Sequence, residues 1–115
     1  MALDRNSLLK ISRKVEPVAV PEWGGTVHIR EISISEKDSL EGSYDQANKS
    51  GAWWQDFRAR LLVLCICDEQ GNRIFTDEDV SRVAELPACG ATRVWEAAAT
   101  LNKLRKDDQE TLEKN

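Results

Sequence analysis

The apolar run LLVLCIC, residues 61–67, constrains the fold of this chain more than any other segment. Seven consecutive apolar residues are buried on all sides in a folded protein, so the run belongs at the centre of the core. It is far shorter than the roughly 20 residues that cross a bilayer. With the segment before it, the run predicts a buried helix over residues 52–66, and a strand ending at Cys67 is the alternative. The first face of this helix carries Trp53, Phe57, Leu61 and Leu64.

A β-hairpin is predicted over residues 15–31. Pro17 and Pro21 favour extended backbone at the residues before them and remove hydrogen-bond donors. The first strand is therefore expected on an edge of its sheet. Gly24 and Gly25 are expected to supply the positive φ angles of a tight connection to the second strand.

The second strand of the hairpin, TVHIRE at residues 26–31, alternates apolar and polar side chains. Val27 and Ile29 are expected inside, with His28 and Arg30 on the opposite, solvent-facing side. Because His28 is the only histidine, its outward position argues against a cysteine–histidine nucleophile pair. The chain also has no G-x-S-x-G motif, no phosphate-binding glycine loop and no H-E-x-x-H motif. The residues therefore predict a protein that is not an enzyme and has no catalytic residues and no cofactor.

Three more helices are predicted. The first covers residues 36–48, with Ser35 as N-cap and Asp38 where a capping box prefers glutamate. The others cover residues 77–86 and 89–104. The apolar stripe of the first consists of Leu40, Tyr44 and Ala47. The core-facing positions of the other two are Val80, Val83 and Ala84, then Val94, Ala97, Ala98, Leu101 and Leu104. The exposed stripe of the last helix is Arg93, Glu96, Thr100 and Lys103.

These elements predict an α+β fold that is mainly α. We expect a single globular domain over residues 1–106, in which the N-terminal β-hairpin packs on a small bundle of about four helices. A short helix around Ser7–Arg13, with Leu8 and Ile11 on one side, precedes the hairpin. Residues 107–115 contain one apolar residue and are expected to form a flexible acidic tail.

The acidic segment DEQGNRIFTDEDV, residues 68–80, resembles a calcium loop at first sight. With Gly71 at the sixth position of an EF-hand loop, the first ligand position falls on Ile66, and the twelfth lacks its glutamate. A turn at Gly71 followed by a helix with Thr76 as N-cap and Asp79 as its third residue accounts for the pattern. We therefore predict a capped helix and no metal site.

Charge and cysteine content exclude further classes of protein. The net charge of −4 and the isoelectric point near 5.0 give no basic surface for nucleic acid, and no segment predicts a membrane span. Cys65, Cys67 and Cys89 are an odd number of cysteines in a chain without a recognisable secretory signal. They indicate free thiols in a reducing cytoplasm.

Four tryptophans in 115 residues are the most informative part of the composition, because two of them are adjacent. Neighbouring helical residues point about 100° apart, so Trp53 and Trp54 do not both enter one core. Trp53 shares the stripe of Phe57, whereas Trp54 is expected outside, and tryptophan is enriched at binding hot spots. We interpret Trp53, Trp54 and Tyr44 as candidate partner-binding residues.

Two longer segments, in this order, resemble the tail assembly chaperones of bacteriophages with long, non-contractile tails. They are VAVPEWGGTVHIREIS at residues 18–33 and CDEQGNRIFTDEDVSRVAELP at residues 67–87. The following AAATLNKL, residues 97–104, and the short acidic end are also similar to that family. The resemblance extends over Val18–Leu104.

The resemblance implies a phage or prophage protein that binds the tape measure protein in the host cytoplasm and keeps it soluble. It also implies recruitment of the tail tube protein, absence from the mature virion and, in many phages, a longer form made by ribosomal frameshifting. Self-association is left open, and neither nucleic acid nor a membrane is an expected partner. The alternative function is a head–tail connector or tail completion protein that stays in the virion.

Overall fold

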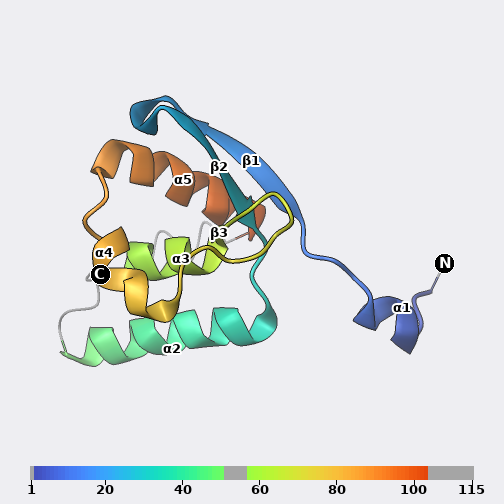
Figure 1. Ribbon diagram of the computed structural model, residues 1–115. Helices are drawn as coiled ribbons and strands as arrows, with labels where there is room; N and C mark the ends of the chain where they lie inside the picture. The colour runs from blue at the N-terminus through green and yellow to red at the C-terminus, as the bar shows by residue number, and fades with distance from the viewer. Residues whose placement is uncertain (1, 51–56, 104–115) are drawn as a thin grey trace.

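The computed structural model describes the backbone of residues 2–50 and 57–103, and the side chains of residues 2–42 and 57–103. A small antiparallel sheet and the helices lie in layers (Figure 1). Helix α5 (Ala88–Leu101) packs on the sheet, α3 (Phe57–Cys65) packs on α5, and α2 (Ile34–Ser50) packs on the far side of α3. The predicted fold, α+β and mainly α, is confirmed.

The predicted hairpin forms two strands of the sheet, β1 (Val15–Val20) and β2 (Gly25–Arg30). The strand order is β1-β2-β3, so β1 occupies an edge, as Pro17 predicts. Pro21 lies outside the strand, because it begins a 3-10 turn, η1 (Pro21–Trp23).

The turn between the strands closes at Gly24. Its φ of 76° is left-handed, and its N–H donates to the Pro21 carbonyl at 3.1 Å. The expectation of a positive φ at Gly25 is wrong, because Gly25 is already an extended residue of β2. The indole of Trp23 lies so close to α5 that a Cβ at Gly90 would overlap the Trp23 Nε1 atom.

The apolar run forms both of the elements considered for it. Within the described residues, α3 ends at Cys65 instead of continuing to residue 66, and Ile66–Cys67 form β3, which pairs antiparallel with β2. Residues 61–67 are all buried, because β2 and the other helices surround them. The start of the predicted helix, residues 52–56, lies outside the described part of the chain. The backbone of a helix cannot form hydrogen bonds with the edge of a strand. The change from helix to strand at Ile66 therefore gives partners to the N–H and C=O groups on the edge of β2.

The capping box at the N-terminus of α2 lies two residues before the predicted one. The Glu36 N–H donates to Ser33 Oγ at 3.1 Å, and the Ser33 N–H donates to Glu36 Oε1 at 2.9 Å. Ser33 is therefore the N-cap in place of Ser35, because it has a glutamate three residues later. Leu40 is buried as predicted, whereas the side chain of Ala47 lies outside the described set.

The predicted helix over residues 77–86 is shorter in the structure. It consists of a 3-10 turn, η2 (Asp77–Asp79), and one turn of α-helix, α4 (Val80–Val83). Its two valines are buried as predicted. The prediction for Ala84 is wrong, because the helix ends before it and leaves its side chain exposed.

Helix α5 has the predicted amphipathic division. Val94 and Ala98 are fully buried, and Ala97 and Leu101 are partly buried against the core. The predicted polar positions are exposed: Arg93, Glu96, Thr100 and Lys103. The helix ends at Leu101, and Lys103 follows it with a left-handed φ of 52°. Leu104 lies outside the described residues.

The first helix, α1 (Arg5–Leu9), lies apart from the layered body at the end of an extended segment (Figure 1). It begins earlier than the predicted Ser7–Arg13, because Asp4 caps it by accepting the Ser7 N–H at 2.8 Å. None of its residues is buried. The single domain predicted over residues 1–106 stays a prediction.

Candidate partner-binding surfaces

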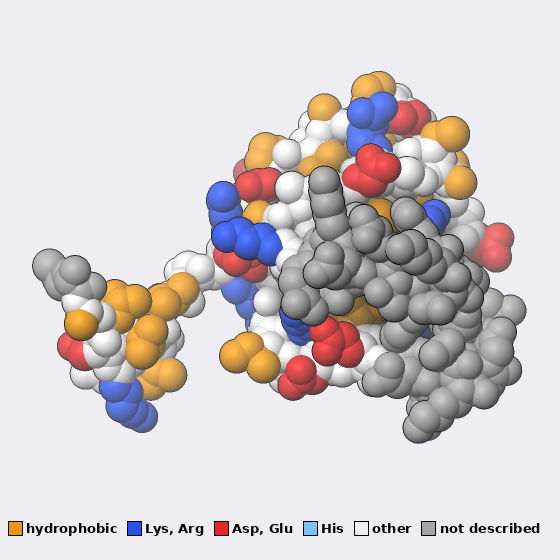
Figure 2. All heavy atoms as spheres, turned by 180° about the vertical axis from the view of Figure 1, so that it is seen from behind, with side chains coloured by type: hydrophobic (Ala, Val, Ile, Leu, Met, Phe, Trp, Pro, Cys, Tyr) orange, Lys and Arg blue, Asp and Glu red, His pale blue; other side chains and the backbone are white. Residues whose placement is uncertain are grey.

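Residues 2–13, which we call the arm, carry a group of apolar side chains that the described body does not cover. Figure 2 shows them together on the separate lobe that the arm forms. Their exposed fractions are 60% for Leu3, 51% for Leu8, 70% for Leu9 and 65% for Ile11. Four large apolar side chains on so short a segment mark a surface that a partner could cover.

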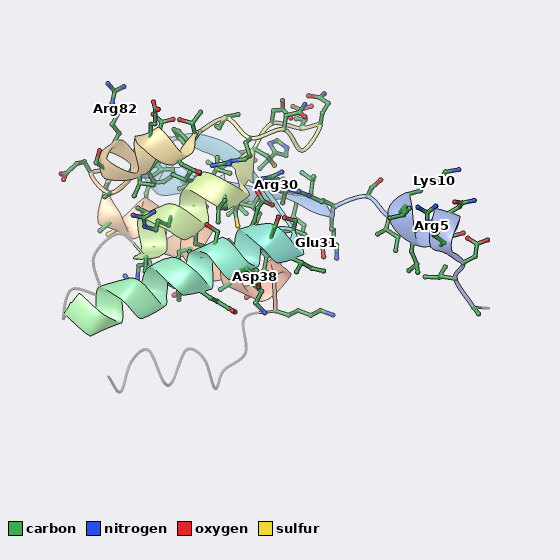
Figure 3. All side chains as sticks on the ribbon, turned by 90° about the horizontal axis from the view of Figure 1, so that it is seen from below. Arg5, Lys10, Arg30, Glu31, Asp38 and Arg82 are labelled. Atoms are coloured by element: carbon green, nitrogen blue, oxygen red, sulfur yellow. The ribbon has the colours of Figure 1, made fainter. Side chains whose placement is uncertain are left out.

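The same segment is basic. The arm contains Arg5, Lys10 and Arg13 but only one acidic residue, Asp4, which gives it a formal charge of +2. The rest of the chain therefore carries −6, because the net charge of the whole chain is −4. Figure 3 shows Arg5 and Lys10 on the arm, well away from the labelled residues of the body.

The root of the arm is fixed to the body by three contacts. The Lys14 N–H donates to Glu31 Oε1 at 2.7 Å, and the Glu31 N–H donates to the Lys14 carbonyl at 2.9 Å. The Arg13 guanidinium pairs with Glu36 Oε1 at 2.9 Å. The contacts between Lys14 and Glu31 extend the β1–β2 ladder one position beyond its last pair, Val15 with Arg30. The chain before Arg13 lies outside the body (Figure 1).

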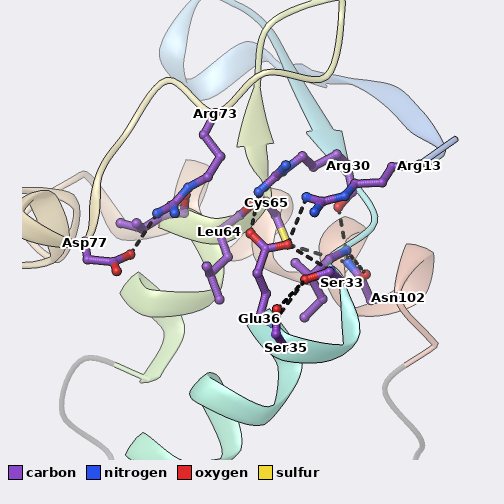
Figure 4. A network of polar contacts seen from close by, with 12 residues as sticks. Arg13, Arg30, Ser33, Ser35, Glu36, Leu64, Cys65, Arg73, Asp77 and Asn102 are labelled. Atoms are coloured by element: carbon purple, nitrogen blue, oxygen red, sulfur yellow. Dashed lines mark hydrogen bonds and ion pairs between the residues drawn. The ribbon is translucent and has the colours of Figure 1, made fainter. Parts of the chain in front are cut away.

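Glu36 lies at the centre of the polar network in Figure 4. Its second carboxylate oxygen, Oε2, pairs with Arg30 Nη2 at 2.6 Å, and Arg30 Nε donates to the Leu64 carbonyl at 3.0 Å. The expectation that Arg30 faces solvent is wrong, since only 7% of it is exposed. The reason is tertiary: the last carbonyls of α3 need donors, and a guanidinium provides them with a favourable charge.

The same surroundings set the charge state of Glu36. Burial alone would raise the pKa of this carboxyl group, but the Ser33 N–H and the Arg30 and Arg13 charges lower it below its ordinary value. Burial lowers the pKa of Arg30, and the Glu36 charge opposes that effect. The pair is therefore ionised at neutral pH and joins β2, α2, α3 and the arm root.

The hollows on the described surface of the body include an apolar one and a charged one. One, of about 160 Å³, lies where α3, α4 and α5 meet. Its lining is mostly apolar and consists of Arg58, Ala59, Leu62, Val83, Ala84, Leu86, Ala88, Ala91 and Thr92. The other, of about 200 Å³, is lined in large part by charged and hydroxyl side chains, among them Glu36, Arg60, Arg73 and Asp77.

The acidic segment forms the turn that the sequence predicts. Asp68 Oδ1 accepts the N–H groups of Gln70 and Asn72, each at 2.9 Å, and Gly71 has a φ of 89°. These bonds, that from Asn72 foremost, lower the pKa of Asp68. The Thr76 N–H donates to Asp79 Oδ2 at 2.8 Å, which confirms the capped start of the next helix. Among the side chains that the structure describes, those of residues 2–42 and 57–103, no cluster of three or more histidine, cysteine or acidic groups could hold a metal ion.

The cysteines are free, as predicted, and two of the three are buried. Burial raises the pKa of Cys65 to about 12 and also raises the pKa of Cys67. His28, which was expected in solvent, is half-buried and opposite Cys67 in the strand register. The raised pKa keeps the Cys67 thiol protonated at neutral pH. Cys89 is exposed on α5.

The predicted partner-binding residues remain predictions. Trp53 and Trp54 lie in residues 51–56, outside the described part, and the same holds for the side chain of Tyr44 on α2. The arm and the apolar hollow were not predicted as surfaces. The signal that could have found the arm is a short basic segment with four large apolar residues: Leu3, Leu8, Leu9 and Ile11. The hollow depends on three helices meeting and left no local signal.

Comparison with known proteins adds the family. The family model described as phage tail assembly chaperone matches residues 9–114. A solved structure, that of the bacteriophage HK97 tail assembly chaperone, is similar with a TM-score of 0.61 and 21% sequence identity. The similarity covers 84% of this chain and 90% of that one, and at this identity it supports the shared fold. No curated protein matches the chain, and no described helix is long and apolar enough to cross a membrane. Because the family model matches nearly the whole chain, the protein belongs to the phage tail assembly chaperone family.

Proposed function

We propose that this protein binds the tape measure protein of its phage in the host cytoplasm and keeps that chain soluble until the tail tube forms around it. The observation that carries the proposal is the family match over residues 9–114. The proposed role is a binding role without catalysis. It includes recruitment of the tail tube protein, joint action with a longer frameshifted form, and release before the virion is complete.

The physical basis of the proposal is apolar recognition. A long helical protein that has not yet been enclosed presents apolar stripes, and a partner shields them by covering them with apolar side chains of its own. We place the contact at Trp53 and Trp54, together with Tyr44 on α2. The tryptophans lie in the segment between the end of α2 at Ser50 and the start of α3 at Phe57.

Co-expression with the tape measure protein tests the proposal directly. The tape measure protein should stay in the soluble fraction and co-purify with this chain, and it should precipitate when expressed alone. Mass spectrometry of purified virions separates the chaperone from a head–tail connector or tail completion protein. A chaperone is absent from the particle, whereas stoichiometric amounts in the virion would refute the proposed role.

Trp54→Ala tests the proposed contact residue. A buried tryptophan anchor is worth about 2 kcal/mol or more, so the variant should lose most of the co-purifying tape measure protein. Its circular dichroism melting curve should remain within a few degrees of the wild-type curve. Leu40→Ala is the contrasting control, because Leu40 is buried and its loss should lower the melting temperature. A melt that collapses in Trp54→Ala would place that residue in the core.

A further inference from the structure

The charged hollow, which lies between α2, α3, η2 and α4, has an arginine without an acidic partner on its rim. The ionisable side chains of the rim are Glu36, Arg60, Arg73 and Asp77. Among the described side chains, Arg60 is exposed and makes no ion pair. We propose that this hollow receives an acidic side chain of the tape measure protein, which pairs with Arg60. This contact rests on the proposed function and gives it a docking position.

The charges at the hollow favour an anion as the occupant. Four arginines line it or pair with its rim, against two carboxylates, so this group carries +2 in a chain whose net charge is −4. The group consists of Arg13, Arg30, Arg60, Arg73, Glu36 and Asp77. Burial foremost lowers the pKa of Arg30, and repulsion from Arg13 and Arg73 lowers it further. A carboxylate in the hollow would offset this repulsion.

The hydrogen bonds of the rim leave Arg60 available for that carboxylate. Arg73 Nε donates to the Val63 carbonyl at 3.3 Å, and Arg73 Nη2 pairs with Asp77 at 2.9 Å (Figure 4). These contacts fix Arg73 at the end of α3, whereas the guanidinium of Arg60 makes no such contact within the described structure. A guanidinium can donate two parallel hydrogen bonds to one carboxylate. The exposed hydroxyl of Ser39 is a second donor on the rim.

The floor and the flanks of the hollow favour a protein side chain over a free anion. The floor is apolar and buried, and consists of Leu40, Val63, Leu64 and Val80. The methylene groups of a glutamate can cover such a floor, whereas inorganic phosphate has no apolar part. Outside the arm, the large apolar side chains that the described structure leaves exposed are Ile34, at 83%, and Ile74, at 56%. Each is next in sequence to a residue that lines the hollow, Ser35 or Arg73, so a partner over the hollow can cover both.

Helix α2 connects the hollow with one of the proposed contact residues. Ser35, at the start of α2, lines the hollow, and Tyr44 follows on the same helix, about 14 Å away along its axis. A helical partner that lies along α2 spans this distance in about three turns. The same segment of tape measure protein can therefore contact both places, with its apolar stripe on α2 and an acidic residue in the hollow.

Co-purification of co-expressed tape measure protein with the Arg60→Glu variant tests the inference. The variant should retain at least tenfold less tape measure protein than wild type, because attraction of the carboxylate becomes repulsion. The matched control is Arg82→Glu, which changes the net charge equally, since Arg82 on α4 points away from the body in Figure 3. It should retain as much as wild type. Equal retention by Arg60→Glu and wild type would overturn the docking position and leave the proposed function intact. A wild-type chain that retains no tape measure protein would refute both.

A second variant tests the hollow without changing its charge. Ser39 lines the hollow and is exposed on α2, so Ser39→Phe should fill the hollow while the circular dichroism spectrum stays unchanged. Its loss of tape measure protein should match that of Arg60→Glu, and full retention would refute the hollow as the docking position.

Salt dependence and self-association identify the occupant. Raising sodium chloride from about 0.05 M to about 0.5 M should weaken tape measure binding by wild type more than by Arg60→Gln, because salt screens the ion pair. Equal salt dependence of the two would overturn the ionic contact. Sedimentation equilibrium without tape measure protein should give the same result for Arg60→Glu and wild type. Weaker self-association of the variant would assign the hollow to a contact between copies, and the inference would fail.

Discussion

Replacing Glu36 with alanine should destabilise the fold strongly, although the Glu36 side chain is partly exposed. The change leaves the Arg30 guanidinium, whose side chain is 8% exposed, without the carboxylate that lies 2.6 Å from it. It also removes the acceptor of the Ser33 N–H at the start of α2 and the partner of Arg13 at the arm root.

The magnitude follows from these three losses. Removing one partner of a buried ion pair costs about 3–5 kcal/mol. The lower end applies here, because the Glu36 side chain is 16% exposed and water reaches part of the pair. The lost cap adds about 1 kcal/mol. The Arg13 contact adds less than about 1 kcal/mol, because the Arg13 side chain is 40% exposed. Since contacts that share one carboxylate are not additive, we expect a loss of about 3–4 kcal/mol.

Urea unfolding followed by tryptophan fluorescence measures this loss, which should lower the midpoint by about 2 M at a typical slope for a small domain. Ser33→Ala is the control for the cap and should cost about 1 kcal/mol. Arg13→Ala is the control for the exposed pair and should cost less. Replacing the pair together, Arg30→Met with Glu36→Leu, should restore most of the stability, because no unpaired charge stays buried.

The pH dependence gives an independent check. The folded state lowers the pKa of Glu36 from its ordinary value of 4.5, so its contribution is complete above that value and is lost as the pH falls through the folded pKa. The difference in stability between wild type and Glu36→Gln should thus be constant from neutral pH to about 5 and shrink in acid. A Glu36→Ala variant within 0.5 kcal/mol of wild type, as is usual for roughly neutral surface changes, would refute the reasoning.

Four further predictions concern other parts of the fold. Gly90→Ala should lower the free energy of unfolding, measured in urea, by about 1–2 kcal/mol. The new Cβ would overlap the indole ring of Trp23, and the cost of that overlap exceeds the gain in helix propensity from glycine to alanine. Gly42→Ala, with open space around the new Cβ, should stabilise by up to about 1 kcal/mol. Only Cys89 should react rapidly with a thiol reagent in the native protein, and all three thiols should react in guanidinium. Asp79→Ala should cost about 1 kcal/mol, since it removes the acceptor of the Thr76 N–H. If Asp79→Ala is as stable as wild type, the helix does not start at Thr76.

Local patterns were sufficient where neighbouring residues decide the conformation. The β-hairpin, the edge position of β1, the turn at Gly71 and the two-sided character of α5 all follow from residues close in sequence. The capping box of α2 was also present in the sequence as Ser33 and Glu36, and the prediction selected a weaker pair beside it.

Other features required contacts between distant residues. Arg30 is on the polar side of an alternating strand, and its burial is explained by two partners on other elements, the carboxylate of Glu36 and the carbonyl of Leu64, 34 positions later. The change from helix to strand after Cys65 is decided by the free edge of β2. For the functional surfaces, the sequence drew attention to tryptophans in a segment that the described structure does not include.

The sequence by itself determined the fold class and the resemblance to phage tail assembly chaperones. Hydrophobic periodicity, turn residues and family motifs all depend on residues that are close together in the sequence. The tertiary structure alone decided which polar groups are buried and which apolar groups are left uncovered. Burial depends on the neighbours that the fold brings together, so leucine side chains are buried in α3 and exposed in α1.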